Sequence, residues 1–302
     1  MDAVRRIADA VLYEGYILWP YRKSALKNQQ RFGFGTIDPG GFNQTDCLLE
    51  AGDDCRVEVT VRFLHLVERQ LWREGRRVDE LEIAGELHQS WEEAVEREVR
   101  FEFDTCSPAR VPVDVEAGVT REELGGDCAV ERSWRALRGS TEASAAQLRP
   151  GLFRLRVRTE NATPDGEFRS AHTVLVARAG SFVSLTDPPS GLRAEADGCE
   201  NVGLWPVLAG EEGDRSTLLA SPIILPDYPQ IAPESPGDLF DATEIDQMLV
   251  LNILSLTDDE RREMRSADPR AREILERTES LSEEELMRLH GTIREFGLAR
   301  RP

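Results

Sequence analysis

A period-two alternation of apolar and polar residues is the feature that most restricts the fold. Val57, Val59, Val61 and Phe63 are separated by single charged or polar residues. Alternate side chains of a strand point to the same face, so this pattern predicts a half-buried strand that starts near Asp53. Similar patterns or extended segments occur around residues 99–103, 111–115, 153–157, 172–178, 181–186, 203–208 and 217–225.

The predicted strands are amphipathic and are joined by short turns, which favours an antiparallel sheet with one buried face. The expected body is therefore an antiparallel β-sandwich or barrel over residues 53–221. Gly75 marks one hairpin turn, and Ala179-Gly180 marks another between strands at 172–178 and 181–186. The polar stretch 117–148 is expected to be an insertion with a short helix.

The two ends of the chain have helical patterns, so the predicted class is mainly β (α+β). Val4, Ile7, Ala8 and Val11 recur at spacings of three and four, which predicts one helix. This helix and an aromatic and basic loop make up residues 1–52, expected to pack on the body.

Residues 222–241 form a proline-rich tether and residues 242–302 an acidic, small C-terminal helical segment. In this tail, Thr257 and Glu260 have capping-box spacing, Pro269 suits a first helical position, and 282–285 is a second capping box. The apolar stripe of the tail is expected to pack on the body, with a partner protein as the alternative.

The charge of the chain argues against nucleic-acid binding. The 302 residues carry a formal net charge of -19, and such a surface repels polyanions. No apolar run approaches the length of a transmembrane span, and Met1 to Arg6 lack the apolar core of a signal peptide. We therefore expect a soluble, cytoplasmic protein with no transmembrane segment.

The sequence contains no self-sufficient catalytic motif. Five widely spaced cysteines without C-x-x-C predict ordinary reduced thiols. His65 is expected to be a packed histidine and His172 a strand-edge residue, while a metal set of His88, Glu92 and a cysteine has no compelling spacing. We therefore assign no catalytic residue, no metal and no cofactor.

The densest aromatic and basic stretch, residues 13–31, is the candidate binding site. It lies in a strongly acidic chain and contains both lysines of the protein. Aromatic residues and arginine commonly anchor protein interfaces, and basic groups also bind anions. Packing of the aromatic residues in the core is an equally good interpretation. The candidate residues for a partner or an anion are Tyr13, Glu14, Tyr16, Trp19, Tyr21, Arg22, Lys23, Lys27 and Asn28.

Several strings give the chain a family resemblance that spans most of its length. They lie at residues 10–16, 20–25, 27–28, 181–189, 205–207, 221–225 and 232–246. With them the chain resembles an uncharacterised family encoded near uptake NiFe-hydrogenase genes in actinobacteria and related soil bacteria. The resemblance implies an accessory role in hydrogenase assembly or organisation, with hydrogenase subunits or maturation factors as partners. It carries over no catalytic residue.

Two hypotheses of function follow. The first and favoured one is a non-enzymatic accessory or scaffold protein for a multi-protein enzyme complex. The alternative is a small-molecule-binding protein or enzyme with a loop-built site around residues 13–31. A flat aromatic patch in this segment would favour the first, and a deep pocket with Glu14 and Lys23 buried would favour the second.

Overall fold

A computed structural model describes residues 2–13, 34–230, 253–254, 256–267 and 269–280. The helical elements are α1 (Asp2–Tyr13), a 3₁₀ turn (Ser190–Leu192), α3 (Arg193–Asp197), α5 (Asp258–Ala267) and α6 (Pro269–Glu279). The strands are β1 (Phe42–Arg73), β2 (Arg76–Val78), β3 (Glu80–Ile83), β4 (Glu86–Gln89), β5 (Trp91–Asp104), β6 (Ala109–Val115), β7 (Gly118–Gly125), β8 (Cys128–Trp134), β9 (Leu137–Arg149), β10 (Leu152–Asn161), β11 (Arg169–Val183), β12 (Trp205–Leu208) and β13 (Thr217–Ser221).

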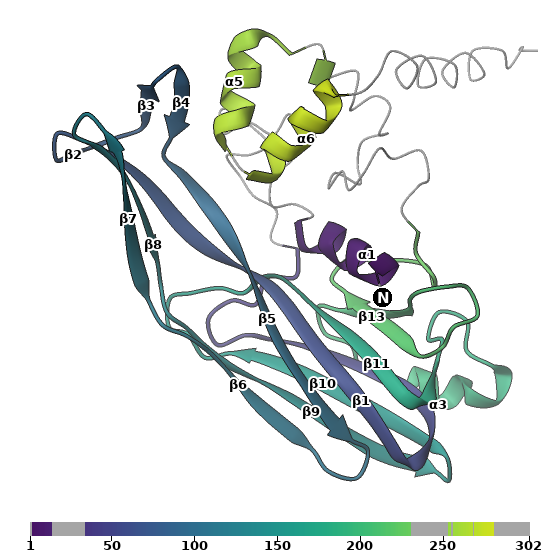
Figure 1. Cartoon of the computed structure of the whole chain (residues 1–302). Coiled ribbons are helices and arrows are strands. Elements are labelled where there is room, and N and C mark those ends of the chain that lie inside the picture. Colours follow the sequence, from purple (N-terminus) through teal and green to yellow (C-terminus); the bar gives the residue numbers. More distant parts are fainter. Residues whose placement is uncertain (1, 14–33, 231–252, 255, 268, 281–302) are drawn as a thin grey trace, which may run out of the picture.

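The strands form one large antiparallel sheet and a separate β3–β4 hairpin. The main path through the sheet is β12-β13-β11-β1-β10-β9-β6, with β2, β5 and β8 also paired to β1 and β7 paired to β8. Figure 1 shows that this sheet curls into a half-barrel. The predicted class, a mainly β body with a small C-terminal helical segment, is confirmed.

The long strand β1 organises the molecule, because different parts of it pair with different neighbours. Its first part pairs with β10 and β11, its middle with β11 and β5, and its last part with β8 and β2. The predicted inward face is confirmed, since Val57, Val59, Val61 and Phe63 are all fully buried. The strand starts at Phe42, however, well before the expected start near Asp53.

The last part of β1, together with β2, β7 and β8, extends away from the half-barrel (Figure 1). We call this extension, with the β3–β4 hairpin at its tip, the arm. Within the arm, β1 reverses into β2 at the turn predicted at Gly75, where Glu74 and Gly75 have φ angles of 49° and 74° and Arg73 pairs with Arg76. Two consecutive positive φ angles fit the tight turn of a two-residue hairpin.

Two expectations about the sheet are wrong. Residues 117–148 contain no helix; they form β7, β8 and nearly all of β9, because their polar side chains lie on exposed strand faces. Residues 172–186 do not form a hairpin either. β11 runs straight through Ala179, whose φ of 63° is accommodated where the pairing with β1 shifts between Ala51 and Arg56.

The helices near both ends pack on the sheet. The predicted apolar stripe of α1 is buried against Val207, Ala209 and Leu219. The described part of the C-terminal tail also packs on the chain itself, because Met264, Ile274 and Leu275 share a cluster with residues of α1, β1 and β5. The capping box is confirmed: the Glu260 amide donates to Thr257 Oγ1 at 3.3 Å, and Glu260 Oε2 accepts from the Thr257 amide at 2.9 Å.

Candidate binding hollow

The predicted binding segment lies almost wholly outside the described residues. Of its nine candidates, only Tyr13 is described, as the last residue of α1. The others, Glu14, Tyr16, Trp19, Tyr21, Arg22, Lys23, Lys27 and Asn28, stay a prediction. The second predicted capping box, at 282–285, also lies outside the described part of the chain.

A large hollow lies at the junction of the half-barrel, the arm and α5. Its volume is about 1320 Å³. Its lining comes from β1, the β3–β4 hairpin, the start of β5, the stretch from the end of β8 to the start of β9, the loop that leads into β11, and Glu263 of α5. We call it the hollow below. Such large concave surfaces are where proteins most often bind ligands and partners.

The hollow exists because β1 changes partners there. On one edge, pairing with β11 ends at Leu64, and pairing with β8 starts at Glu68. Between these positions that edge of β1 has no strand partner among the described residues. The segment from Ser133 to Leu137 and the loop at 165–169 meet beside this gap, where Arg135 Nη1 donates to the Asp165 carbonyl at 2.8 Å, and both line the hollow. The cavity is therefore a consequence of the topology of the sheet.

His65 on β1 forms part of the floor and is fully engaged, as expected for a packed histidine. Its Nε2–H donates to the Arg135 carbonyl at 2.9 Å, and its Nδ1 accepts from Arg97 Nη2 at 3.4 Å. Burial and the nearby Arg97 charge lower the pKa of His65. The ring is therefore neutral, and both nitrogens are occupied, which disfavours a role as a general base.

Arg69, also on the floor, ties the arm to α5. Its Nη1 donates to the Ser266 carbonyl at 3.3 Å, and its Nε lies 3.5 Å from a Glu93 carboxylate oxygen. Ser266 also donates through its hydroxyl to Gln89 at 3.2 Å. These contacts hold α5 beside the β3–β4 hairpin, so the helix forms a fixed wall of the hollow.

The aromatic ring of Trp134 lines the hollow and is held in one orientation. Its indole N–H donates to the Glu116 carbonyl at 3.0 Å. The ring lies against Gly118, the residue opposite it in the β7–β8 pair, where a Cβ would be 2.4 Å from Cζ2. Because glycine leaves this space and the N–H is satisfied, the ring is held ready for a contact in the hollow.

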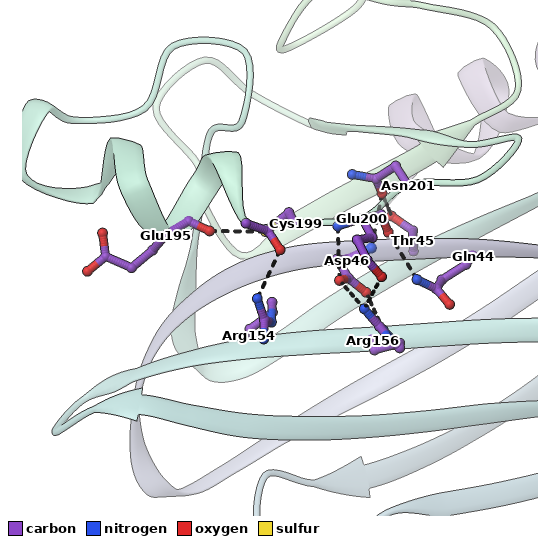
Figure 2. Close-up of polar contacts among 10 residues, drawn as sticks. Gln44, Thr45, Asp46, Arg154, Arg156, Glu195, Cys199, Glu200 and Asn201 are labelled. Atoms are coloured by element: carbon purple, nitrogen blue, oxygen red, sulfur yellow. Dashed lines mark hydrogen bonds and ion pairs between the residues drawn. The ribbon is translucent and has the colours of Figure 1, made fainter.

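A second polar cluster, on the outer face of the sheet, serves a structural purpose (Figure 2). The carboxylate of Asp46 is fully buried and accepts two hydrogen bonds from Arg156, at 2.8 and 2.7 Å. It also accepts from the Glu200 amide at 3.0 Å, while Asn201 Oδ1 accepts from the Asp46 amide at 3.0 Å. These bonds fasten the segment around residue 200 to β1 and β10, and three donors from the chain itself occupy the buried carboxylate, so it serves a structural contact.

Two of the cysteines, Cys47 and Cys199, are poorly reactive thiols. All five are free thiols, as predicted. Burial raises the pKa of Cys199 to about 11 and raises that of Cys47 well above its usual value. Thiols that stay protonated at neutral pH are poor nucleophiles.

Comparison with protein-family models and with curated proteins finds no match. The resemblance to a hydrogenase-associated family therefore stays a prediction. In the described part of the chain, no helix has the length and apolar character needed to span a membrane. Within those same residues, no three His, Cys, Asp or Glu side chains are placed to hold a metal ion.

Sequence reasoning did not single out the hollow. His65 and Glu92 belong to its lining, but the sequence indicates only a packed histidine and a weak metal ligand at these positions. The lining residues are contributed by six segments between residues 65 and 263, so no local spacing connects them. The one available signal was a tryptophan within the polar stretch 117–148, since an aromatic residue among polar neighbours often marks a contact surface.

Proposed function

We propose that this protein is a non-enzymatic accessory protein that binds a partner protein in the hollow. The observation that carries the proposal is the hollow itself, whose volume of about 1320 Å³ exceeds the range of about 300–1,000 Å³ typical of small-molecule sites. Its wall includes a tryptophan held in place before binding, and such residues dominate the energy of protein interfaces.

The remaining predictions fit this proposal. It places the protein in the cytoplasm, with hydrogenase subunits and maturation factors as the first partners to test because of the family resemblance. The alternative, a small-ligand site around residues 13–31, rests on residues outside the described part of the chain. No described contact favours it over the hollow.

Affinity co-purification from the native host tests the proposal. The tagged full-length protein should recover one partner at near-stoichiometric level, and Trp134→Leu should lose it. Trp205→Leu is the matched control, because Trp205 is 44% exposed on the edge strand β12, outside the hollow. Both variants should keep the far-UV spectrum of the wild type. Equal recovery of the partner by both variants would remove the hollow from the proposal.

A further inference from the structure

The charge of the hollow points to the chemistry of its occupant. Seven carboxylates and three guanidinium groups line it. The guanidinium groups already face carboxylates: Arg69 faces Glu93, and the other two are paired at 3.1 and 2.8 Å with acidic neighbours of the loop at 165–169. The positive charges are therefore neutralised, and a surplus of negative charge faces the cavity.

Three carboxylates of the lining are exposed and have no ion pair with a described residue: Glu68, Asp79 and Glu80. Glu68 lies directly opposite Glu92 in the β1–β5 register. Exposed carboxylates attract a cation and repel an anion.

The aromatic wall suits the same kind of ligand. Trp134 lines the hollow together with these carboxylates. A guanidinium or ammonium group is attracted to the face of an indole, and arginine additionally forms paired hydrogen bonds with a carboxylate. An aromatic ring in the lining of the same cavity therefore favours a cationic side chain over an apolar one.

We infer that the hollow binds a basic, extended segment of a partner protein, with arginine or lysine side chains against Trp134 and the Glu68, Asp79 and Glu80 carboxylates. This inference deepens the proposed function and rests on it. The size of the cavity fits several residues of a peptide, and its lining comes from six segments, so contacts are available along an extended chain. The negative charge of the lining favours basic residues in the bound segment of the partner.

A binding assay with labelled peptides tests the inference. The probe is a fluorescein-labelled peptide of alternating arginine and serine, measured by anisotropy at low ionic strength with the full-length protein. A peptide of the same length that alternates glutamate and serine is the charge control. We expect the arginine peptide to bind, the glutamate peptide not to bind, and salt to weaken the complex.

Two triple variants separate the hollow from the general acidity of the protein. The hollow variant is Glu68→Gln, Asp79→Asn and Glu80→Gln. The control variant is Asp187→Asn, Asp197→Asn and Glu212→Gln, which removes the same charge at exposed positions outside the hollow. We expect the Kd to rise about tenfold in the hollow variant and less than about twofold in the control, since each exposed ion pair contributes modestly and three are lost together only in the hollow variant.

Equal weakening by both variants would overturn the inference, because binding would then follow net charge alone. Absence of peptide binding to the wild type would also overturn it. If the peptide does not bind but the partner is still lost with Trp134→Leu, the charge assignment fails while the proposed function stands. If the peptide binds as expected but no partner is recovered from the host, the proposed function fails and the ligand class of the hollow stands.

Discussion

Acid should destabilise this protein through one buried histidine. His172 was expected at a strand edge, but it lies inside the sheet on β11 and is fully buried, because β13 and β1 pair with β11 on either side. Its Nδ1–H donates to the Ser170 carbonyl at 3.1 Å, so the neutral ring keeps its lone pair on Nε2. That buried atom has no hydrogen-bond partner.

Burial, together with the groups that face His172, sets its pKa. Arg62 is its direct neighbour in the register of β1 and β11, and it pairs with Asp9 of α1 at 2.6 Å and with Glu96 of β5 at 3.1 Å. Burial is the largest cause and lowers the pKa of His172 from 6.5 to about 4; the hydrogen bond to the Ser170 carbonyl opposes it, the Arg62 charge lowers the pKa further, and Glu96 raises it slightly.

The size of the effect follows from linkage. Between pH 6.5 and about 4 the unfolded chain binds a proton at His172 and the folded protein does not, so stability falls as the pH falls through this interval. At about 1.4 kcal/mol per pH unit the loss is about 3 kcal/mol. Below about pH 4 both states are protonated, and this contribution stops changing.

Urea unfolding at a series of pH values measures this loss. We expect the wild type to lose about 3 kcal/mol more than His172→Asn between about pH 7 and pH 4, because asparagine does not titrate and the carboxylates contribute equally to both. As a second measurement, the imidazole proton shifts of His172 in the folded wild type should not change down to about pH 5. A midpoint near 6.5, or parallel stability curves for the two proteins, would refute the reasoning.

Three further substitutions test the structure. Asp46→Asn should lower the free energy of unfolding, measured with urea, by about 2 kcal/mol, because it removes the buried partner of the Asp46–Arg156 ion pair. The control Glu160→Gln, at the more exposed pair with Arg158, should change it by less than about 0.5 kcal/mol. Equal effects of the two variants would contradict the structural role of the polar cluster around Asp46. Gly118→Ala should lower the melting temperature and weaken binding of the arginine peptide, because the added methyl group displaces the indole of Trp134. In the control Gly191→Ala the methyl group meets no atom within 4 Å, so neither property should change. Thr257→Ala should cost about 1 kcal/mol of local stability in α5, seen as faster amide hydrogen exchange there, and unchanged exchange would contradict the capping box.

The local patterns of the sequence determined the elements. The alternation from Val57 to Phe63 predicted a strand with one buried face, and the spacing of Val4, Ile7, Ala8 and Val11 predicted the buried stripe of α1. The Thr257 capping box and the Gly75 turn were also predictable. In each case the signal lies within a few neighbouring residues, and the physical cause, side-chain periodicity or a local hydrogen bond, acts over the same short range.

The pairing of distant strands decided the features that these local patterns do not specify, namely the extent of β11, the strands at 117–148 and the hollow. β11 continues through Ala179 because β1 accommodates the irregularity, and the polar residues 117–148 become strands because β1 and β10 supply their partners. The hollow arises only where β1 exchanges β11 for β8, which places Glu68, Trp134 and Glu263 around one cavity. Contacts between residues so far apart in the chain depend on the closure of the whole sheet, and a sequence pattern with a range of a few residues does not contain them.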